Sequence, residues 1–380
     1  MAAIKIKLSA AVIIIILTSF VAAQARTTLV SLPLRQTVAI RLGDMGKTLI
    51  QEKRILTLKK GMNKIDFSWQ NVMIDPSSIT LATLSNPDKI KILSVSYPPN
   101  EAALIWDIES QDSLEEEVMI SYLLANIDGM VTYKAVADKK ETVIDLNTYL
   151  VLRNFSGENF DRITAFTRLG KPFNTTIQHL ETKRILVSRE RNIPIKKVYT
   201  WDALKMPHEP EKERKAVGIP TSYEFVTSLH KGKARLFQED NQGSSIFLGE
   251  DNAKFTPKGE KTTLQIGDSR DIRVTQLRID TKRTNIKLNT KGKMQVYDEL
   301  CKDRITMENL KESPVTLSLI QTIPGQWKPV DISMPYTQKD HKILVFNVTL
   351  LPKEKKTLNM HYKILNIFAQ KFSRYNRVHY

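Results

Sequence analysis

Apolar and polar residues alternate with a period of two along most of this chain, and this feature restricts its fold most. The pattern is clear in Lys64-Ile-Asp-Phe-Ser-Trp69 and Lys89-Ile-Lys-Ile-Leu-Ser-Val95, and it recurs in His341-Lys-Ile-Leu-Val-Phe-Asn-Val348. Successive side chains of a β-strand point to opposite faces, so alternation indicates one buried and one wet face. Turn residues such as Asp75-Pro76 and Asn86-Pro87 separate the runs. The sequence therefore predicts an all-β chain of tandem antiparallel β-sandwich modules.

Helical periodicity is scarce, so we expect few short helices. The nearest candidates are Ala203-Leu-Lys205 and Asp298-Glu-Leu-Cys-Lys-Asp303. Asp128-Gly129 stands between two strand-like runs and predicts a hairpin turn, because glycine adopts a positive φ without steric cost. The acidic run Glu115-Glu-Glu117 at a strand entrance is interpreted as a solvated edge that discourages aggregation.

Composition and punctuation divide the chain into six segments. The expected organisation is a signal peptide at 1–25, an N-terminal β module at 26–112, a middle β module at 113–204, a charged proline-containing linker at 205–221, a C-terminal β-sandwich at 222–366 and a basic aromatic tail at 367–380. The linker is assigned from its three prolines, its dense mixed charge and its weak apolar periodicity.

The first 25 residues have the pattern of a cleavable export signal. Lys5 and Lys7 precede an apolar run from Ala10 to Val21, and Ala23-Gln-Ala25 is a small-x-small cleavage pattern. The run is shorter than the about 20 apolar residues that a membrane anchor needs. We therefore expect an exported protein, periplasmic or extracellular, with no transmembrane span after signal removal. The alternative is an uncleaved N-terminal anchor.

The chain is strongly basic, with a formal net charge of +16, and loss of Lys5 and Lys7 with the signal leaves +14. Such a charge favours attraction to anionic surfaces. An exported protein meets anionic lipids and acidic polysaccharides before it meets nucleic acid. The expected partners are therefore an envelope protein or an anionic surface of polysaccharide or lipid headgroups, and not nucleic acid. Bases and acids are interspersed, so a solvated basic surface is the simpler interpretation. The sequence does not specify the oligomeric state.

The sequence lacks the common short motifs of catalytic and metal-binding sites. Neither His-Glu-x-x-His, Cys-x-x-Cys nor Gly-x-Ser-x-Gly occurs, and the histidines are isolated. The segment His208-Glu-Pro-Glu-Lys-Glu213 is interpreted as an acidic linker rather than a cation site. Cys301 is the only cysteine, which excludes a disulfide within the chain, and the alternation around it predicts a half-buried core thiol. We predict no catalytic, cofactor-binding or metal-binding residue.

The best contact candidates are aromatic and basic. Trp69 and Trp106 lie in alternating runs and are expected in the core, whereas Trp201 and Trp327 neighbour loops and are expected to be exposed. The tail carries three bases and no acid, so it is either a docking strand or an edge strand or frayed end. The residues that we expect to make surface contacts are Trp201, Trp327, Lys371, Arg374 and Arg377.

Asn154, Ser156 and Glu158 surround Gly157 between two strand-like runs. Asn and Ser side chains commonly bond their own turns, and glycine supplies the backbone freedom that a reversal needs. We therefore interpret this group as a self-capped turn rather than a ligand site.

Five runs recur in a characteristic order along the chain. They are residues 54–67, with a Lys-Gly turn, residues 120–133, residues 151–160, residues 233–240 and residues 351–362. Together these runs resemble the bacterial family of unknown function found in mucoidy-inhibitor-A-like proteins. No single run is specific, but their order along the chain matches the family. The coiled-coil hairpin that members often carry is absent. The resemblance implies stacked β-sandwich modules in a cell-envelope or extracellular setting, with no established chemistry.

These observations predict an exported envelope or extracellular protein of non-catalytic, scaffolding or binding function. Its contacts would be with proteins or with surfaces. The alternative is a carbohydrate-active or other hydrolase whose site forms only in three dimensions, because the spacing of paired carboxylates is not visible in a sequence.

Overall fold

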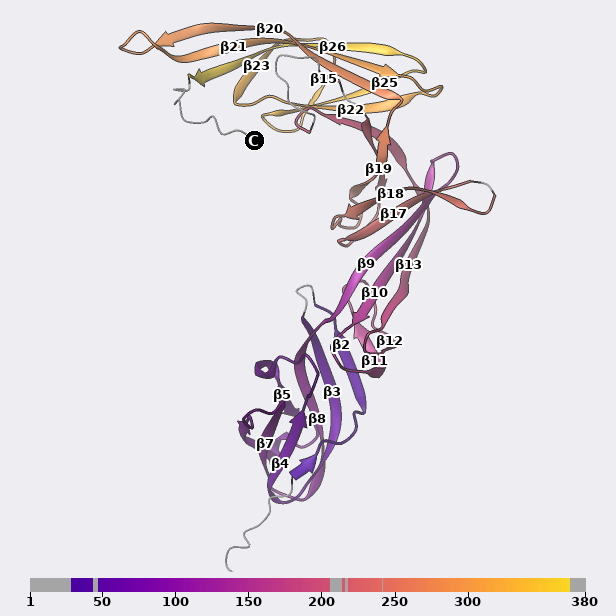
Figure 1. Ribbon diagram of the computed structural model, residues 1–380, viewed down its shortest axis with the longest axis vertical. Helices are drawn as coiled ribbons and strands as arrows, with labels where there is room; N and C mark the ends of the chain where they lie inside the picture. The colour runs from indigo at the N-terminus through magenta and orange to yellow at the C-terminus, as the bar shows by residue number, and fades with distance from the viewer. Residues whose placement is uncertain (1–28, 44–46, 206–213, 216–217, 241, 370–380) are drawn as a thin grey trace, which may run out of the picture. The chain divides into compact units, whose positions relative to one another are not determined.

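The structure is a computed structural model that describes residues 29–43, 47–205, 214–215, 218–240 and 242–369 (Figure 1). Strands dominate these residues, and the helical turns are two short 3-10 helices, η1 (Pro76–Ser78) and η2 (Pro87–Lys89). Asp75 caps η1, because its carboxylate accepts a hydrogen bond from the Ser77 amide. The all-β prediction with few short helices is confirmed.

The chain forms two compact units, and each is assembled from two separate segments. Among the described residues, unit 1 comprises 29–130 and 150–185, and unit 2 comprises 131–149 and 186–369. These limits differ from the module limits expected at residues 112 and 204. The physical reason at residue 112 is strand pairing, because residues 114–125 pair along their whole length with residues 47–58.

Unit 1 contains two sheets. Sheet A has the order β1-β4-β7-β6 and sheet B the order β12-β11-β2-β3-β8-β5. The strands of sheet A are β1 (Leu29–Ser31), β4 (Gly61–Ser68), β6 (Ile90–Ser96) and β7 (Ala103–Ser110). Those of sheet B are β2 (Thr37–Arg41), β3 (Lys47–Leu58), β5 (Thr80–Thr83), β8 (Leu114–Ala125), β11 (Phe160–Phe166) and β12 (Phe173–Ile177).

The two sheets of unit 1 share one hydrophobic core. It includes Ile65 and Trp106 from sheet A and Ile50, Tyr122 and Ile163 from sheet B, all of them buried. The ring of Phe67 lies 5.9 Å from that of Trp106 and 5.8 Å from that of Tyr122. Alternate residues of β3 and β8 point into this core, as the period-two pattern predicts.

Sheet C has the order β13-β10-β9-β17-β18. Its strands are β9 (Ile127–Ala137), β10 (Val143–Asn154), β13 (Thr182–Pro194), β17 (Gly232–Glu239) and β18 (Ser245–Ala253). The strand β9 pairs in parallel with β17, which lies about 100 residues later in the chain.

The remaining two sheets belong to unit 2. Sheet D has the order β19-β16-β14-β22-β25-β24 and sheet E the order β15-β20-β21-β26-β23. The strands of sheet D are β14 (Lys196–Asp202), β16 (Ile219–Val226), β19 (Lys261–Ser269), β22 (Val315–Thr322), β24 (Thr337–Gln338) and β25 (Ile343–Leu350). Those of sheet E are β15 (Arg214–Lys215), β20 (Ile272–Leu288), β21 (Met294–Asn309), β23 (Gln326–Ile332) and β26 (Lys355–Phe368).

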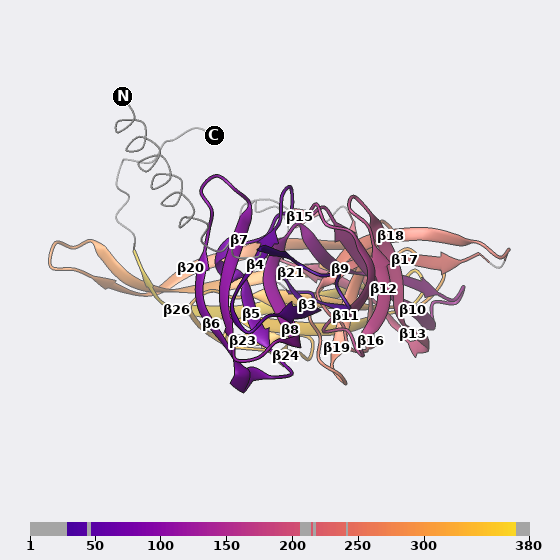
Figure 2. The ribbon, with the colours of Figure 1, turned by 90° about the horizontal axis from the view of Figure 1, so that it is seen from below.

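Sheets D and E also share a hydrophobic core, which includes Trp201, Leu319 and Phe346 from sheet D and Ile305 and Leu358 from sheet E. One end of sheet E differs from the rest. There the hairpin of β20 and β21 extends beyond the other strands of the sheet (Figures 1 and 2). Its turn at residues 289–293 is closed by a hydrogen bond from the Lys293 amide to the Asn289 side chain.

Three local predictions are wrong. Residues 298–303 are strand, because they lie within β21 and pair with β20 and β26. Residues 128–129 lie inside β9, and the chain bends instead at Asn126, where φ is 59°. Glu116 is fully buried rather than solvated, because its carboxylate accepts hydrogen bonds from the amides of Leu84, Ser85 and Asn86.

Part of the expected linker at 205–221 lies outside the described residues, and with it His208 and its acidic neighbours. The described end of that segment is strand. Ile219 begins β16, whose pairing with β19 runs from Ile219 opposite Ser269 to Val226 opposite Lys261.

Candidate functional site

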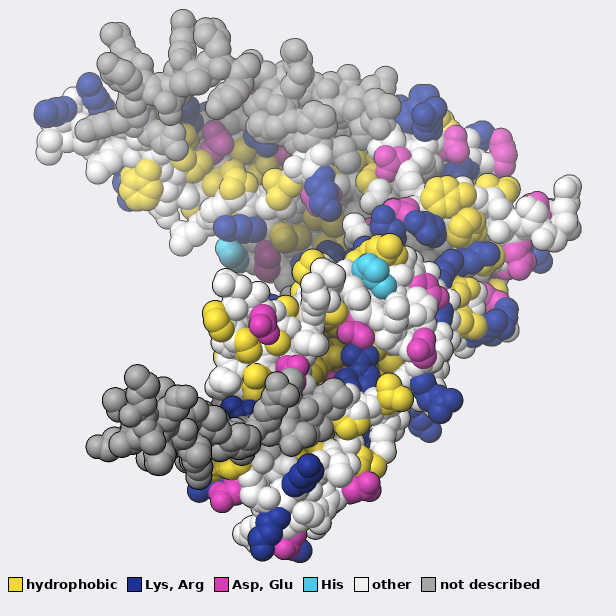
Figure 3. All heavy atoms as spheres, turned by 60° about the horizontal axis from the view of Figure 1, so that its bottom comes forward, with side chains coloured by type: hydrophobic (Ala, Val, Ile, Leu, Met, Phe, Trp, Pro, Cys, Tyr) yellow, Lys and Arg dark blue, Asp and Glu magenta, His cyan; other side chains and the backbone are white. Residues whose placement is uncertain are grey.

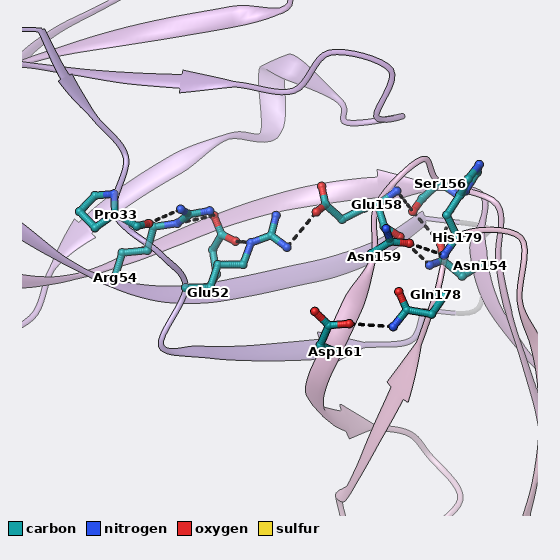
Figure 4. Close-up of polar contacts among 11 residues, drawn as sticks. Pro33, Glu52, Arg54, Asn154, Ser156, Glu158, Asn159, Asp161, Gln178 and His179 are labelled. Atoms are coloured by element: carbon teal, nitrogen blue, oxygen red, sulfur yellow. Dashed lines mark hydrogen bonds and ion pairs between the residues drawn. The ribbon is translucent and has the colours of Figure 1, made fainter.

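A buried ion network lies beside a cavity in unit 1. Glu52 on β3 is fully buried, and both of its oxygens contact arginines. Nε and Nη2 of Arg54 donate to Glu52 Oε1 at 3.1 and 3.0 Å, and Arg35 Nε lies 2.5 Å from Glu52 Oε2. Arg35 also reaches Glu158, with Nη1 at 2.9 Å from Oε1. Figure 4 shows these contacts extending from the Pro33 carbonyl, which Arg54 also contacts, toward Glu158.

The network keeps Arg35 charged. Burial alone would lower the pKa of Arg35, but Tyr122, Glu52 and Glu158 together outweigh it and raise that pKa. Burial, reinforced by Glu52, raises the pKa of Tyr122, so this phenol stays neutral. The Tyr122 hydroxyl is buried and has no hydrogen-bond partner among the described residues.

The cavity has a volume of about 280 Å³ and a mixed lining. Its charged and polar lining residues are Arg35, Arg54, Asp66, Ser68 and Glu158, and the indole of Trp69 contributes an apolar wall. A space of this size and polarity is large enough for water or a small polar molecule. Arg35, in the loop before β2, forms ion pairs with both Glu52 and Glu158. These pairs hold the loop against β3 and against the turn at residue 158.

The turn at residues 154–158 is self-capped, as predicted. Asn154 is buried; its Oδ1 accepts from Ser156 Oγ at 2.7 Å and its Nδ2 donates to the Glu158 carbonyl at 2.7 Å. Gly157 has φ of 90°, and a Cβ there would lie 2.0 Å from the Asn71 carbonyl oxygen. The Gly157 amide donates to His179 Nδ1 at 3.0 Å. These contacts place Glu158 beside Arg35, so the turn supports the ion network.

A second candidate is the outer part of the β20–β21 hairpin, residues 281–297, which we call the basic hairpin end. It carries five basic residues and no acidic residue. The bases are all exposed, and they are Lys282, Arg283, Lys287, Lys291 and Lys293. Within the described part of the chain, none of them forms an ion pair with a carboxylate. Basic side chains gather at this end of the molecule in Figure 3, at the upper left.

Apolar side chains accompany these bases. Ile286 is 48% exposed and Leu288 60%, and Phe368 on the neighbouring β26 is 70% exposed. Lys287 is directly opposite Val296, which is directly opposite Phe368 on the third strand. Directly opposed residues of adjacent strands share a face of the sheet. A base, a valine and a phenylalanine therefore form one row across the sheet.

The inner end of the hairpin is fixed by a partly buried polar cluster. The guanidinium of Arg278 contacts both carboxylate oxygens of Asp303, and its Nη2 donates to the Tyr362 hydroxyl at 3.0 Å. Tyr362 in turn donates to Asp303 Oδ2 at 3.0 Å. Cys301 is fully buried beside this cluster, and burial raises the pKa of its thiol to about 11. The thiol is a core group, more deeply buried than predicted.

A second carboxylate holds the hairpin further out. Asp298 accepts hydrogen bonds from the Asn366 amide at 3.0 Å and from Asn285 Nδ2 at 2.6 Å, and Lys363 Nζ lies 2.9 Å away. These contacts, led by the Asn366 amide, lower the pKa of Asp298 to about 2. β20, β21 and β26 are thus linked through one side chain where the basic hairpin end begins.

The structure separates the predicted contact residues. Trp201 is fully buried in the core of sheets D and E, so the expectation that it is exposed is wrong. Its place on β14, two residues after the buried Tyr199, puts it on the inner face of the strand. Trp327 is half-buried, and its Nε1 donates to the His341 carbonyl at 2.8 Å. Lys371, Arg374 and Arg377 lie outside the described residues. Trp69 and Trp106 are buried, as predicted.

Comparison with known proteins does not assign the chain to a family. Neither a protein-family model nor a curated protein matches the chain. Across the described residues, no helix is long and apolar enough to cross a membrane. No group of three or more His, Cys, Asp or Glu side chains in the described ranges is arranged to hold a metal ion.

Proposed function

We propose that this chain is an exported protein that attaches to a component of the cell envelope through the basic hairpin end, and that it binds rather than catalyses. The observation that carries the proposal is the composition of that surface. Five exposed bases without a described carboxylate partner lie among exposed apolar side chains. Natural surfaces of this kind mark interaction sites.

The energetics of the hairpin support a binding role. Arg283 lies over the ring of Tyr297, 4.8 Å from its centroid, but the four lysines form no ion pair with a described carboxylate. Folding gains little from such exposed charges, because they form no bond that the unfolded chain lacks. By contrast, the inner part of the same hairpin is stabilised by partly buried contacts of Arg278 with Asp303 and Tyr362 and by the buried hydrogen bond between Tyr362 and Asp303. The hairpin is therefore held by one end and presents the other to solvent.

Export and family membership are part of the same proposal. Cleavage after Ala25 would place the mature chain where envelope surfaces are accessible, and the resemblance to mucoidy-inhibitor-A-like proteins implies the same setting. N-terminal sequencing of the protein recovered from an expressing bacterium checks the first point, and we expect the mature chain to start at Arg26. Recovery of chains that begin at Met1 would contradict it.

The decisive test is co-sedimentation of the purified mature protein with isolated cell envelopes. We expect binding that weakens with added salt, because the attraction is partly electrostatic. We also expect the variant K287Q/K291Q/K293Q to bind more weakly than the wild type. The control variant K171Q/K254Q/K258Q removes three other exposed lysines, so it has the same net charge.

Each outcome decides the proposal. Weaker binding of the hairpin variant alone supports it, whereas equal loss in both variants shows that net charge and not the hairpin matters. Absence of any binding contradicts the proposal, and so does saturable turnover of an envelope polymer by the purified protein, which is the outcome that the hydrolase alternative expects.

A further inference from the structure

We infer that the component bound by the basic hairpin end is a bilayer surface of anionic phospholipid, into which its apolar side chains insert. This inference rests on the proposed function and names its partner. Anionic polysaccharides, proteins and lipid headgroups all attract bases, so the choice among them depends on what lies between the bases.

The apolar side chains favour lipid. Ile286, Leu288 and Phe368 are each at least 48% exposed, and Lys287 adjoins the first two in the chain. A polysaccharide offers hydroxyl and carboxylate groups, which gain nothing from an isoleucine or a leucine. At the boundary between headgroups and acyl chains, the same surface can place its bases on phosphates and its apolar groups among the acyl chains.

The geometry of the strands permits shallow insertion. In the basic hairpin end, Lys287 pairs with Val296 and Leu288 with Met294, with an irregular register on either side of Lys287, and β26 pairs with the other side of β21 as far as Phe368. Backbone groups that enter an apolar phase must already be hydrogen-bonded. As far as Val296, β21 has a paired strand on each side, whereas beyond Gln276 no described strand pairs with the outer edge of β20, so only side chains are expected to insert. Lysine side chains have long apolar stems, so Lys287, Lys291 and Lys293 can keep their ammonium groups at phosphate level while their stems lie deeper.

Lys287, Val296 and Phe368 form a row across three strands, so a base and two apolar side chains have fixed relative positions. A simple polybasic segment has no such fixed arrangement. It places the most exposed aromatic ring of the hairpin region on the same face as a base. Aromatic and aliphatic side chains on a rigid sheet lose little conformational freedom on insertion. Binding should therefore keep an apolar component that salt does not screen.

The test uses the mature protein and extruded vesicles, either of phosphatidylcholine alone or with about one third phosphatidylglycerol, at low and high salt. We expect binding to the anionic vesicles only. The variant K287Q/K291Q/K293Q should bind roughly 100-fold more weakly at low salt, at about fivefold per base. The variant I286S/L288S should bind at least about tenfold more weakly, and this loss should persist at high salt.

Matched controls use side chains of similar exposure elsewhere. K171Q/K254Q/K258Q controls for charge, and I246S/L351S controls for exposed apolar area, because Ile246 and Leu351 are each 57% exposed. Both controls should bind like the wild type. A direct readout of insertion is the variant Leu288→Trp, whose emission should shift to shorter wavelength on anionic vesicles and be quenched by brominated acyl chains.

The outcomes separate this inference from the proposed function. If isolated envelopes bind through the hairpin lysines but anionic vesicles do not, the lipid inference is overturned and the attachment function stands. Binding to an anionic polysaccharide that is unaffected by I286S/L288S would overturn it in the same way. Equal vesicle binding by both lysine variants, or no blue shift for Leu288→Trp, would also overturn it.

Discussion

Two regions of this molecule use basic side chains in opposite ways. In unit 1, Arg35 and Arg54 converge on the buried carboxylate of Glu52, and every charge is compensated. On the basic hairpin end of unit 2, five bases have no carboxylate partner among the described residues. A basic side chain that is paired with a buried carboxylate stabilises the fold, whereas one without a carboxylate partner is available to bind another molecule. The number of bases in a region does not make this distinction.

The largest effect is expected where the pairing is most complete. Glu52→Gln removes the charge that compensates Arg35 and Arg54, and breaking a buried pair from one side costs about 3–5 kcal/mol. Chemical denaturation followed by fluorescence measures the free energy of unfolding. The control is Glu117→Gln, which breaks the exposed pair with Lys53 (2.8 Å) and should cost less than about 1 kcal/mol. Equal losses of unfolding free energy in the two variants would show that the buried network contributes no more to stability than an ordinary surface ion pair.

The second effect concerns the inner end of the hairpin. Asp303→Asn weakens the contacts with Arg278 and Tyr362, and hydrogen bonds to a charged group contribute about 1.5–3 kcal/mol. Denaturation of unit 2 should therefore begin at lower denaturant. Glu224→Gln, which breaks the exposed pair with Lys261, is the matched control and should change little. A neutral Asp303→Asn variant would show that the cluster does not hold the hairpin.

The third effect depends on pH. The pKa of Asp298 is lowered to about 2 in the folded chain, against about 4 for an ordinary aspartate. Its stabilisation is therefore present above pH 4 and is lost as the pH falls from about 4 to about 2. We expect the difference in unfolding free energy between the wild type and Asp298→Asn to shrink over that window. A difference that stays constant from pH 7 to pH 2 contradicts the assignment.

The smallest effect is expected at the basic hairpin end itself. K287Q/K291Q/K293Q should change the free energy of unfolding by less than about 0.5 kcal/mol, because exposed side chains without partners contribute little. Thermal and chemical denaturation both measure this. Its envelope binding should fall at the same time, so stability and binding separate. A destabilisation comparable to that of Asp303→Asn would mean that these lysines belong to the fold.

The alternation of side chains predicted the strands well, because a period of two is a local property. Trp106 and Ile65 occupy core positions of β7 and β4 that the pattern identifies directly. Trp201 shows where proximity to a loop misleads. Its spacing of two from Tyr199 already indicated the inner face, and this local pattern was the better guide.

The candidate sites were harder to predict because they depend on topology. Arg35, Glu52 and Glu158 are far apart in the chain, and only the pairing of β2 with both β3 and β11 brings their segments together. The basic hairpin end can be recognised in the sequence, because residues 281–297 contain five bases and no acidic residue. What the sequence could not show is that the bases before and after the turn would share one end of a sheet.

The parallel pair of β9 and β17 has a consequence for the order of synthesis. Val131 pairs with Gly232 and Ala137 with Gln238, so β9 acquires this neighbour only after about 100 further residues have been made. At about 5–20 residues per second, that interval is on the order of 5–20 seconds. During this interval, the edge of β9 that includes Tyr133 and Ala135 lacks the strand that later pairs with it. An unpaired strand edge is a template for association with another chain, so this edge of β9 is open to such contacts until residues 232–238 are in place.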